Sequence, residues 1–359
     1  VPNGRLCVSM PTFQTLAHEV LALEALVKPV APATFRYLDT ILSHAQATVS
    51  WSGANDEGNA RSVLGQIEAL LTSHRFLCKI PWARVERLDD ALQPDTIVID
   101  FLAATENEKR REVLRDSANQ QVWEYAHAHD EKEFHYSDCD LTACLYIAIA
   151  ELLQLPIAMC EIPFHNFVRW RLPDGLYLNW DTNFGYDRWT DAEYRAQKDV
   201  PADSSAFLVT LSREETIGYF NFVQGLGFAR DGRWPEAIRS YRTALTLVPR
   251  VPSARVNIAW AYVTEPALRS TDHTREALTL AQQAVAIFKN SNTVETLAYA
   301  LAENGRFEQA ASSLLEAVAL DSYEAVRDQR ATRVNSRMAD VFRDGKTYLE
   351  DLQNNEETH

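Results

Sequence analysis

Long apolar runs, basic residues and cysteines are all scarce in this chain of 359 residues. No apolar run approaches the roughly 20 residues that a membrane-spanning helix needs, so no such helix is expected. Lys and Arg number 35 against 50 Asp and Glu, which gives a net charge of −15. This balance argues against general binding to nucleic acids and against docking on anionic membranes, because both need a basic face.

The cysteines are five in number and scattered, at positions 7, 78, 139, 144 and 160. An odd, dispersed set in a chain of this size implies no disulfide framework, so a reducing, cytoplasmic setting is expected. The chain opens Val1-Pro2-Asn3-Gly4, with neither a Met nor the basic-then-apolar pattern of a signal peptide. If a leader was removed before Val1, a secreted or periplasmic location applies instead.

Length and hydrophobic periodicity divide the chain into regions. A chain this long fits two or three domains, and an apolar fraction of 46% supplies a real core. Apolar residues at helical spacing predict helices near 13–27, 35–45 and 63–71, and a long charged helix at 106–129. Residues 1–130 carry no chemical motif, so this helical region is expected to pack against a core formed by 131–210.

The central block predicts one buried helix followed by three strands. Ser137 or Asp138 is a natural N-cap, and the apolar run after it reaches Leu153. Strands are expected at 157–162, 166–172 and 176–181. The turn Pro173-Asp174-Gly175 makes the last two an antiparallel hairpin, so the predicted fold class is α+β with a small antiparallel sheet.

A third region, 211–322, contains an internal repeat. Its first copy spaces small and large residues as a tetratricopeptide repeat does, over about 34 residues and two antiparallel helices: Gly225, Phe228, Gly232, Ala237, Tyr241, Ala244 and Pro249. A looser second copy has extra residues near 265–273, and a third covers 297–317. About three such units are needed to cover one another's apolar faces, with 323–359 as capping helices and tail. The array is expected to hold a protein or peptide partner in its groove.

Three side chains of the central block form a candidate nucleophile site. Cys139 lies in the first turn of the buried helix, where unpaired backbone N–H groups and the helix dipole favour a thiolate. His165 follows the adjoining strand and can return to the helix start as a base. Asp181 lies across one hairpin, where its carboxylate can hold the imidazole ring. Cysteine, histidine and aspartate in this layout are typical of nucleophilic catalysis.

The same residues carry a family resemblance. Leu145-Tyr-Ile-Ala-Ile-Ala-Glu-Leu-Leu-Gln-Leu-Pro156, followed by Ile162-Pro-Phe-His-Asn-Phe-Val-Arg169, resembles the transglutaminase-like (papain-like) cysteine superfamily, and more closely its SirB-type proteins. Those proteins also carry a tetratricopeptide segment after the core, so the resemblance covers roughly 131–322. It implies a catalytic Cys139, His165 and Asp181, a thioester intermediate, and a peptide or amide substrate, without a cofactor or metal.

Two functional hypotheses therefore stand side by side. The first is a cysteine hydrolase or acyltransferase, with substrate-cleft candidates on the hairpin at Asn166, Trp170, Asn179 and Trp180. The second is a catalytically silent interaction scaffold, because members of the SirB-type branch often lack a convincing nucleophile. The negative charges of Asp138 and Asp140 also disfavour a thiolate at Cys139 unless His165 is protonated beside it. A zinc site at Cys139, Cys144 and His165 matches no known ligand spacing.

Overall fold

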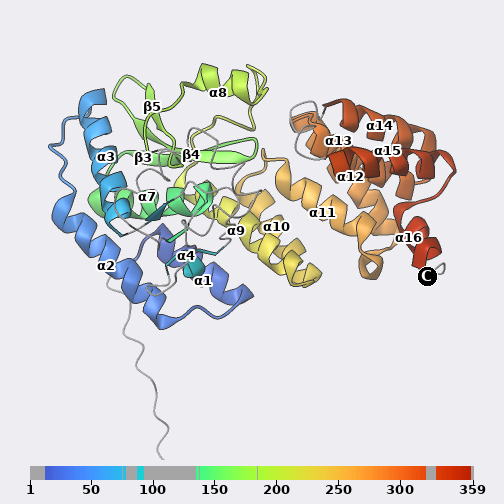
Figure 1. Ribbon diagram of the computed structural model, residues 1–359, viewed down its shortest axis with the longest axis horizontal. Coiled ribbons are helices and arrows are strands. Elements are labelled where there is room, and N and C mark those ends of the chain that lie inside the picture. The colour runs from blue at the N-terminus through green and yellow to red at the C-terminus, as the bar shows by residue number, and fades with distance from the viewer. Residues whose placement is uncertain are drawn as a thin grey trace, which may run out of the picture. The chain divides into compact units, whose positions relative to one another are not determined.

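The computed structural model describes residues 13–74, 76–77, 87–92, 135–136, 138–183, 185–320 and 329–356. The described residues are mostly helical and include a small three-stranded antiparallel sheet, which confirms the expected α+β class (Figure 1). The chain divides into two compact units: 1–202 with 207–220, and 203–206 with 221–359. No helix in the described parts is both long and apolar enough to cross a membrane.

The sheet of unit 1 has the order β3-β4-β5. Its strands are β3 (Ile157–Ile162), β4 (His165–Arg171) and β5 (Tyr177–Trp180), which confirms the three predicted strands to within a residue or so at each end. Cys160 faces Phe167 in the first antiparallel pair. The β4–β5 hairpin closes through Gly175, whose φ of +80° lies in the region that favours glycine. A separate short pair, β1 (Phe76–Leu77) and β2 (His135–Tyr136), runs parallel.

Helix α7 (Cys139–Leu153) is the centre of this unit. Asp138 is its N-cap, with the side chain accepting from the backbone N–H of Leu141 at 3.1 Å. Residues 141–150 are all buried, and the helix ends at Gln154 in the left-handed conformation, two residues before Pro156. It packs against β3, β4, α1 (Leu16–Val27) and α2 (Pro32–Thr48). The hydrophobic run of the sequence is therefore covered on all sides.

The N-terminal helices confirm the predicted periodicity. They are α1, α2 and α3 (Glu57–Ser73), followed by the short α4 (Leu88–Ala91). Most apolar positions expected to face inward, among them Leu21, Ile41 and Leu64, are buried, whereas Phe13, Val27 and Phe35 are partly exposed. The charged helix predicted at 106–129 lies outside the described residues.

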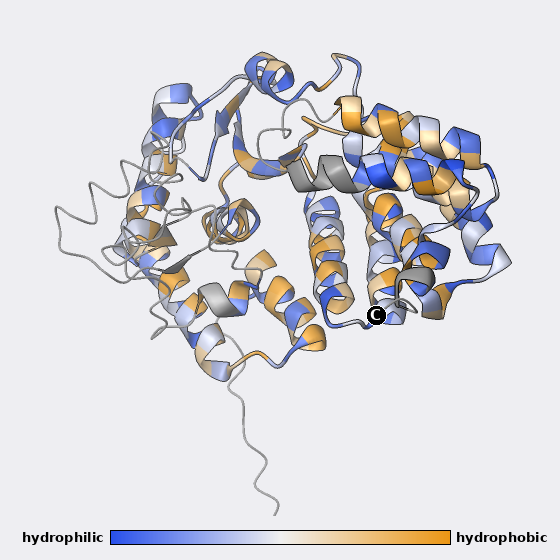
Figure 2. Ribbon diagram, turned by 45° about the vertical axis from the view of Figure 1, so that its right-hand side comes forward, coloured by the Kyte–Doolittle hydropathy of each residue, from blue (hydrophilic) through white to orange (hydrophobic). Residues whose placement is uncertain are grey.

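Unit 2 consists of consecutive helices that pack on one another. After α9 (Arg213–Arg230), in which the division between the units falls, come α10 (Trp234–Leu247), α11 (Ser253–Thr264), α12 (Thr271–Ile287), α13 (Ser291–Glu303), α14 (Phe307–Leu320), α15 (Gln329–Arg343) and α16 (Tyr348–Glu356). A 3₁₀ turn, η2 (Pro266–Leu268), occupies the predicted insertion. Hydrophobic and hydrophilic residues alternate along these helices (Figure 2). Ala237, Ala277 and Ala310 are fully buried, as small residues at helix contacts require.

A further helix, α8 (Asp191–Gln197), lies between β5 and unit 2 in the sequence. Thr190 and Glu193 form a capping box at its start. Its residues reach the sheet face that carries Phe167 and Arg169: the Phe167 and Tyr194 rings stack with centroids 4.4 Å apart, and Arg169 pairs with Asp191 at 2.8 Å. The sheet is therefore contacted by α7 and by α8 through different strand residues.

One buried carboxylate makes stability depend on pH. The Glu24 carboxylate accepts from the backbone N–H groups of Leu88 and Asp89, and burial raises the pKa of Glu24 to about 7. Since the folded pKa lies above the unfolded one, the folded state keeps a proton that the unfolded state releases. We expect the contribution of Glu24 to the free energy of unfolding to be complete below about pH 4.5 and to fall, by roughly 3 kcal/mol, as the pH rises to about 7.

Urea unfolding of the wild type and Glu24→Gln between pH 4.5 and pH 8 measures this contribution as the difference between the two curves. Glu19→Gln, at an exposed position of the same helix, is the control. A difference that stays constant over this pH range would contradict the assignment.

Candidate active site

Cys139 is the first helical residue of α7 and is partly exposed. The extended backbone of Asp138, with φ −82° and ψ −174°, turns the chain into the helix at this point. Cys139 therefore lies at the N-terminal end of α7, where the helix dipole favours a negative charge. The predicted position of Cys139 in the first turn of the helix is therefore confirmed.

His165 and Asp181 contact each other. His165 opens β4 directly after Phe164, whose φ of 60° is part of the tight turn from β3. The His165 Nε2 atom lies 3.2 Å from Asp181 Oδ2; the His165 side chain is 12% exposed and that of Asp181 is completely buried. A buried carboxylate bonded to one imidazole nitrogen holds the ring's orientation and sets which nitrogen faces the rest of the site.

Asp181 is itself held by groups that sequence reasoning missed. The Tyr194 hydroxyl donates to its Oδ2 atom at 3.2 Å, the backbone N–H of Asn183 donates to Oδ1 at 3.1 Å, and Arg188 Nη1 lies 3.8 Å from Oδ2. Burial and the Asp181 charge raise the pKa of Tyr194, so its hydroxyl remains a donor. The Thr-x-x-Glu pattern at 190–193 signals the helix that carries Tyr194, but nothing local indicates its contact with Asp181.

Asp140 forms a second polar cluster, at the helix start. Its Oδ1 atom accepts from Asn166 Nδ2 and, at 2.7 Å, from the Tyr219 hydroxyl of α9, and it lies 3.7 Å from Cys139 Sγ, with the thiol as donor. Burial raises the pKa of Asp140, while its hydrogen bonds to Tyr219 and Asn166 lower it. Burial and the Asp140 charge also raise the pKa of Asp138. Asp138 is the N-cap that the sequence indicated, whereas the contacts of Asp140 with Asn166 and Tyr219 were not predicted from the sequence.

The four predicted cleft residues have different surroundings. Asn166 contacts Asp140 and is 1% exposed. Trp170 is fully buried and donates through Nε1 to Asn55 Oδ1 at 2.7 Å. Trp180 donates through Nε1 to the Tyr146 hydroxyl of α7 at 3.1 Å, so its indole packs toward that helix. The aromatic residue that contacts Asp181 is Tyr194.

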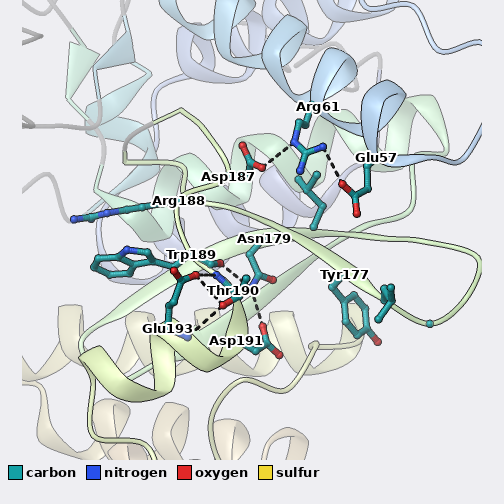
Figure 3. Close-up of a pocket in the computed structure, with 13 residues that line it drawn as sticks. Glu57, Arg61, Tyr177, Asn179, Asp187, Arg188, Trp189, Thr190, Asp191 and Glu193 are labelled. Atoms are coloured by element: carbon teal, nitrogen blue, oxygen red, sulfur yellow. Dashed lines mark hydrogen bonds and ion pairs between the residues drawn. The ribbon is translucent and has the colours of Figure 1, made fainter.

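Asn179, the fourth, lines a cavity of about 420 Å³ (Figure 3). Its side chain donates to Asp191 Oδ1 at 2.7 Å. The cavity wall also includes Arg61, which pairs with Glu57 at 3.0 Å and with Asp187 at 2.8 Å. Because Arg61, Glu57 and Asp187 are paired with one another in the wall, their charges are already neutralised and do not mark a site for a charged ligand.

The remaining described cysteines are core residues. Cys144 and Cys160 are fully buried and free, and burial raises the pKa of both thiols, to about 12 for Cys160. Thiols with such pKa values stay protonated and unreactive at neutral pH. Within the described ranges, no group of three or more His, Cys, Asp and Glu side chains is arranged to hold a metal ion.

The structure thus places His165 and Asp181 in direct contact, and it joins the start of β4 to the start of α7 through Asn166 and Asp140. No protein-family model matches this chain, and no curated protein matches it.

Proposed function

We propose that the protein is a cysteine hydrolase or acyltransferase that acts on an amide or peptide bond through a thioester. The observation that supports this most directly is the His165–Asp181 contact of 3.2 Å, with its buried carboxylate, in the unit whose central helix starts at Cys139. A surface histidine needs no buried acid partner, whereas a catalytic base does. In this proposal Cys139 is the nucleophile, His165 the base and Asp181 the group that orients it.

In the proposed reaction the two ring nitrogens of His165 have different partners, Asp181 and Cys139. His165 Nε2 faces Asp181, so Nδ1 is the nitrogen that takes the proton from Cys139 Sγ. The thiolate attacks the substrate carbonyl carbon, and the imidazolium returns the proton to the departing amine as the C–N bond breaks. This leaves an acyl group on sulfur. Water then releases the acid, or a second amine takes the acyl group, with His165 accepting the proton of the attacking molecule.

The family proposal rests on the same elements. A nucleophile at a helix start, followed by His and Asp on two successive antiparallel strands, is the order in transglutaminase-like cores, here Cys139, His165 and Asp181. The consecutive helices from α9 onward support a tetratricopeptide array after that core. We therefore place the chain with the SirB-type transglutaminase-like proteins as part of this proposal.

A second candidate function is a scaffold that binds a protein or peptide through the helices of unit 2. It is supported by a cavity of about 350 Å³ between α12, α13 and α14, with Leu297, Leu301, Arg306 and Gln309 in its wall. Apolar side chains beside an arginine and an amide suit a peptide with an acidic end. Binding that is unchanged in Cys139→Ala, in a protein without thiol reactivity, would favour this role.

The reactivity of Cys139 toward iodoacetamide separates the two candidates. We expect Cys139 to be alkylated at pH 6–7 well before Cys144 and Cys160, because a thiolate paired with an imidazolium reacts at a pH where ordinary thiols are protonated. Peptide mass spectrometry of the full chain gives the rate at each cysteine. If Cys139 reacts only as the pH approaches about 8.5, the catalytic proposal fails.

A further inference from the structure

The Asp140 cluster connects the two elements that carry the nucleophile and the base. Asp140 directly follows Cys139 on α7, and Asn166 directly follows His165 on β4. The hydrogen bond from Asn166 Nδ2 to Asp140 Oδ1 therefore joins the two elements one residue behind the proposed reacting pair. Tyr219, from the part of α9 that belongs to unit 1, donates to the same oxygen at 2.7 Å.

The hydrogen bonds of Asp140 are strong enough to hold the start of α7 against β4. A carboxylate that accepts from an amide and a phenol makes charge-assisted hydrogen bonds, which are about twice as strong as neutral ones. Asn166 is 1% exposed, so water competes little for its amide. The Cys139 Sγ atom lies 3.7 Å from the shared oxygen, which accepts from the sulfur when the thiol is protonated. The Asp140 carboxylate thus contacts the thiol of its own helix, the strand β4 that carries His165, and a second helix, α9.

Electrostatics alone would give Asp140 the opposite role. A carboxylate beside a thiol disfavours the thiolate, so removing its charge should make Cys139 more reactive. If the carboxylate acts by position, removing it should make Cys139 less reactive, because the thiol and imidazole lose their alignment. The two effects differ in sign and can be told apart by experiment.

We propose that Asp140 is a positioning residue, which holds the Cys139 thiol and aligns the start of α7 with the strand that carries His165, supported by Tyr219. This role rests on the proposed function, since there must be a reactive pair to align. It assigns to α9, the first helix after the core, a direct contribution to the site.

The test compares Asp140→Ala with Asp140→Asn by the pH profile of Cys139 alkylation in the full chain. Asn keeps an oxygen that can accept from Asn166 and Tyr219, whereas Ala keeps none. We expect Asp140→Ala to lower the rate at pH 6.5 about tenfold or more, the size of one lost charge-assisted bond. Asp140→Asn should stay within a few-fold of the wild type or exceed it.

Two further variants provide a second test of the positioning role and a matched control. Tyr219→Phe removes a single hydroxyl and should lower the rate in the same direction by about threefold, less than the loss of a whole bond network. It also carries the test if circular dichroism shows that Asp140→Ala does not fold. Asp138→Asn is the matched control: it removes the carboxylate on the other side of Cys139 while an oxygen remains to cap α7, so its rate should not fall.

The outcomes separate the two proposals. If the wild type reacts at low pH and Asp140→Ala or Tyr219→Phe reacts equally fast or faster, the positioning role is overturned and the proposed function stands. If the wild type itself has no reactivity at low pH, both are overturned, because there is no aligned pair. A loss in Asp140→Ala that Asp140→Asn restores supports the positioning role.

Discussion

In the His165→Ala variant, the alkylation of Cys139 at pH 6.5 is expected to be about 10- to 100-fold slower than in the wild type. An ordinary thiol with a pKa of about 8.5 is only about 1% thiolate at that pH, whereas a thiol paired with an imidazolium is largely ionised. A thiolate with a depressed pKa is also a weaker nucleophile, so the ratio of the two alkylation rates is smaller than the ratio of the two thiolate fractions. The loss of alkylation rate in His165→Ala is large because the imidazole is the group that takes the proton from the Cys139 thiol.

Asp181→Asn should fall between the wild type and His165→Ala. Asn can still accept from His165 Nε2, which lies 3.2 Å from the carboxylate, but it no longer carries the charge that stabilises the imidazolium. Cys139→Ala supplies the background from the four other cysteines and should abolish any turnover. His44→Ala, at an exposed histidine of α2, is the control for losing an imidazole elsewhere. Equal rates in His165→Ala and the wild type would exclude the proposed base.

The second large effect concerns stability in unit 2. We expect Gly225→Ala to lower the free energy of unfolding by about 1–3 kcal/mol, the usual range for an overfilled core. A Cβ atom at Gly225 would lie 2.4 Å from Cε1 and 2.5 Å from Cδ1 of Tyr241, closer than real Cβ contacts allow. Tyr241 is 1% exposed, so its ring has little room to move aside. Urea unfolding measures the change.

Gly65→Ala is the matched control. Gly65 lies inside α3, and a Cβ atom there would meet nothing within 4 Å. The same substitution should therefore stabilise unit 1, by about 0.5–1 kcal/mol, because Ala loses less backbone entropy in a helix. In the double variant Gly225→Ala with Tyr241→Leu, the loss should be smaller than the sum of the two single losses, since the smaller side chain leaves room. A Gly225→Ala protein as stable as the wild type would show that the two helices can separate at no cost.

Some features were determined by the sequence because short-range forces set them. Asp138 caps α7 through its own side chain, so the helix start at Cys139 follows from adjacent residues. Gly175 closes the hairpin because it tolerates a positive φ. The close approach of α9 and α10 is visible in the small residue at 225 and the large one at 241. Periodicity likewise predicted α1, α2 and α3.

Tertiary structure alone decided which side chains meet. In the sequence Asp140 stood out only by its charge beside Cys139, yet its carboxylate binds Tyr219, 79 positions away in the sequence. Trp180 was predicted only as a cleft residue; its indole donates to the Tyr146 hydroxyl of α7, while Tyr194 of α8 contacts the Asp181 carboxylate. Capping and periodicity are encoded within a few residues, so they can be read along the chain. Contacts between elements depend on how whole helices and strands pack, which no local pattern specifies.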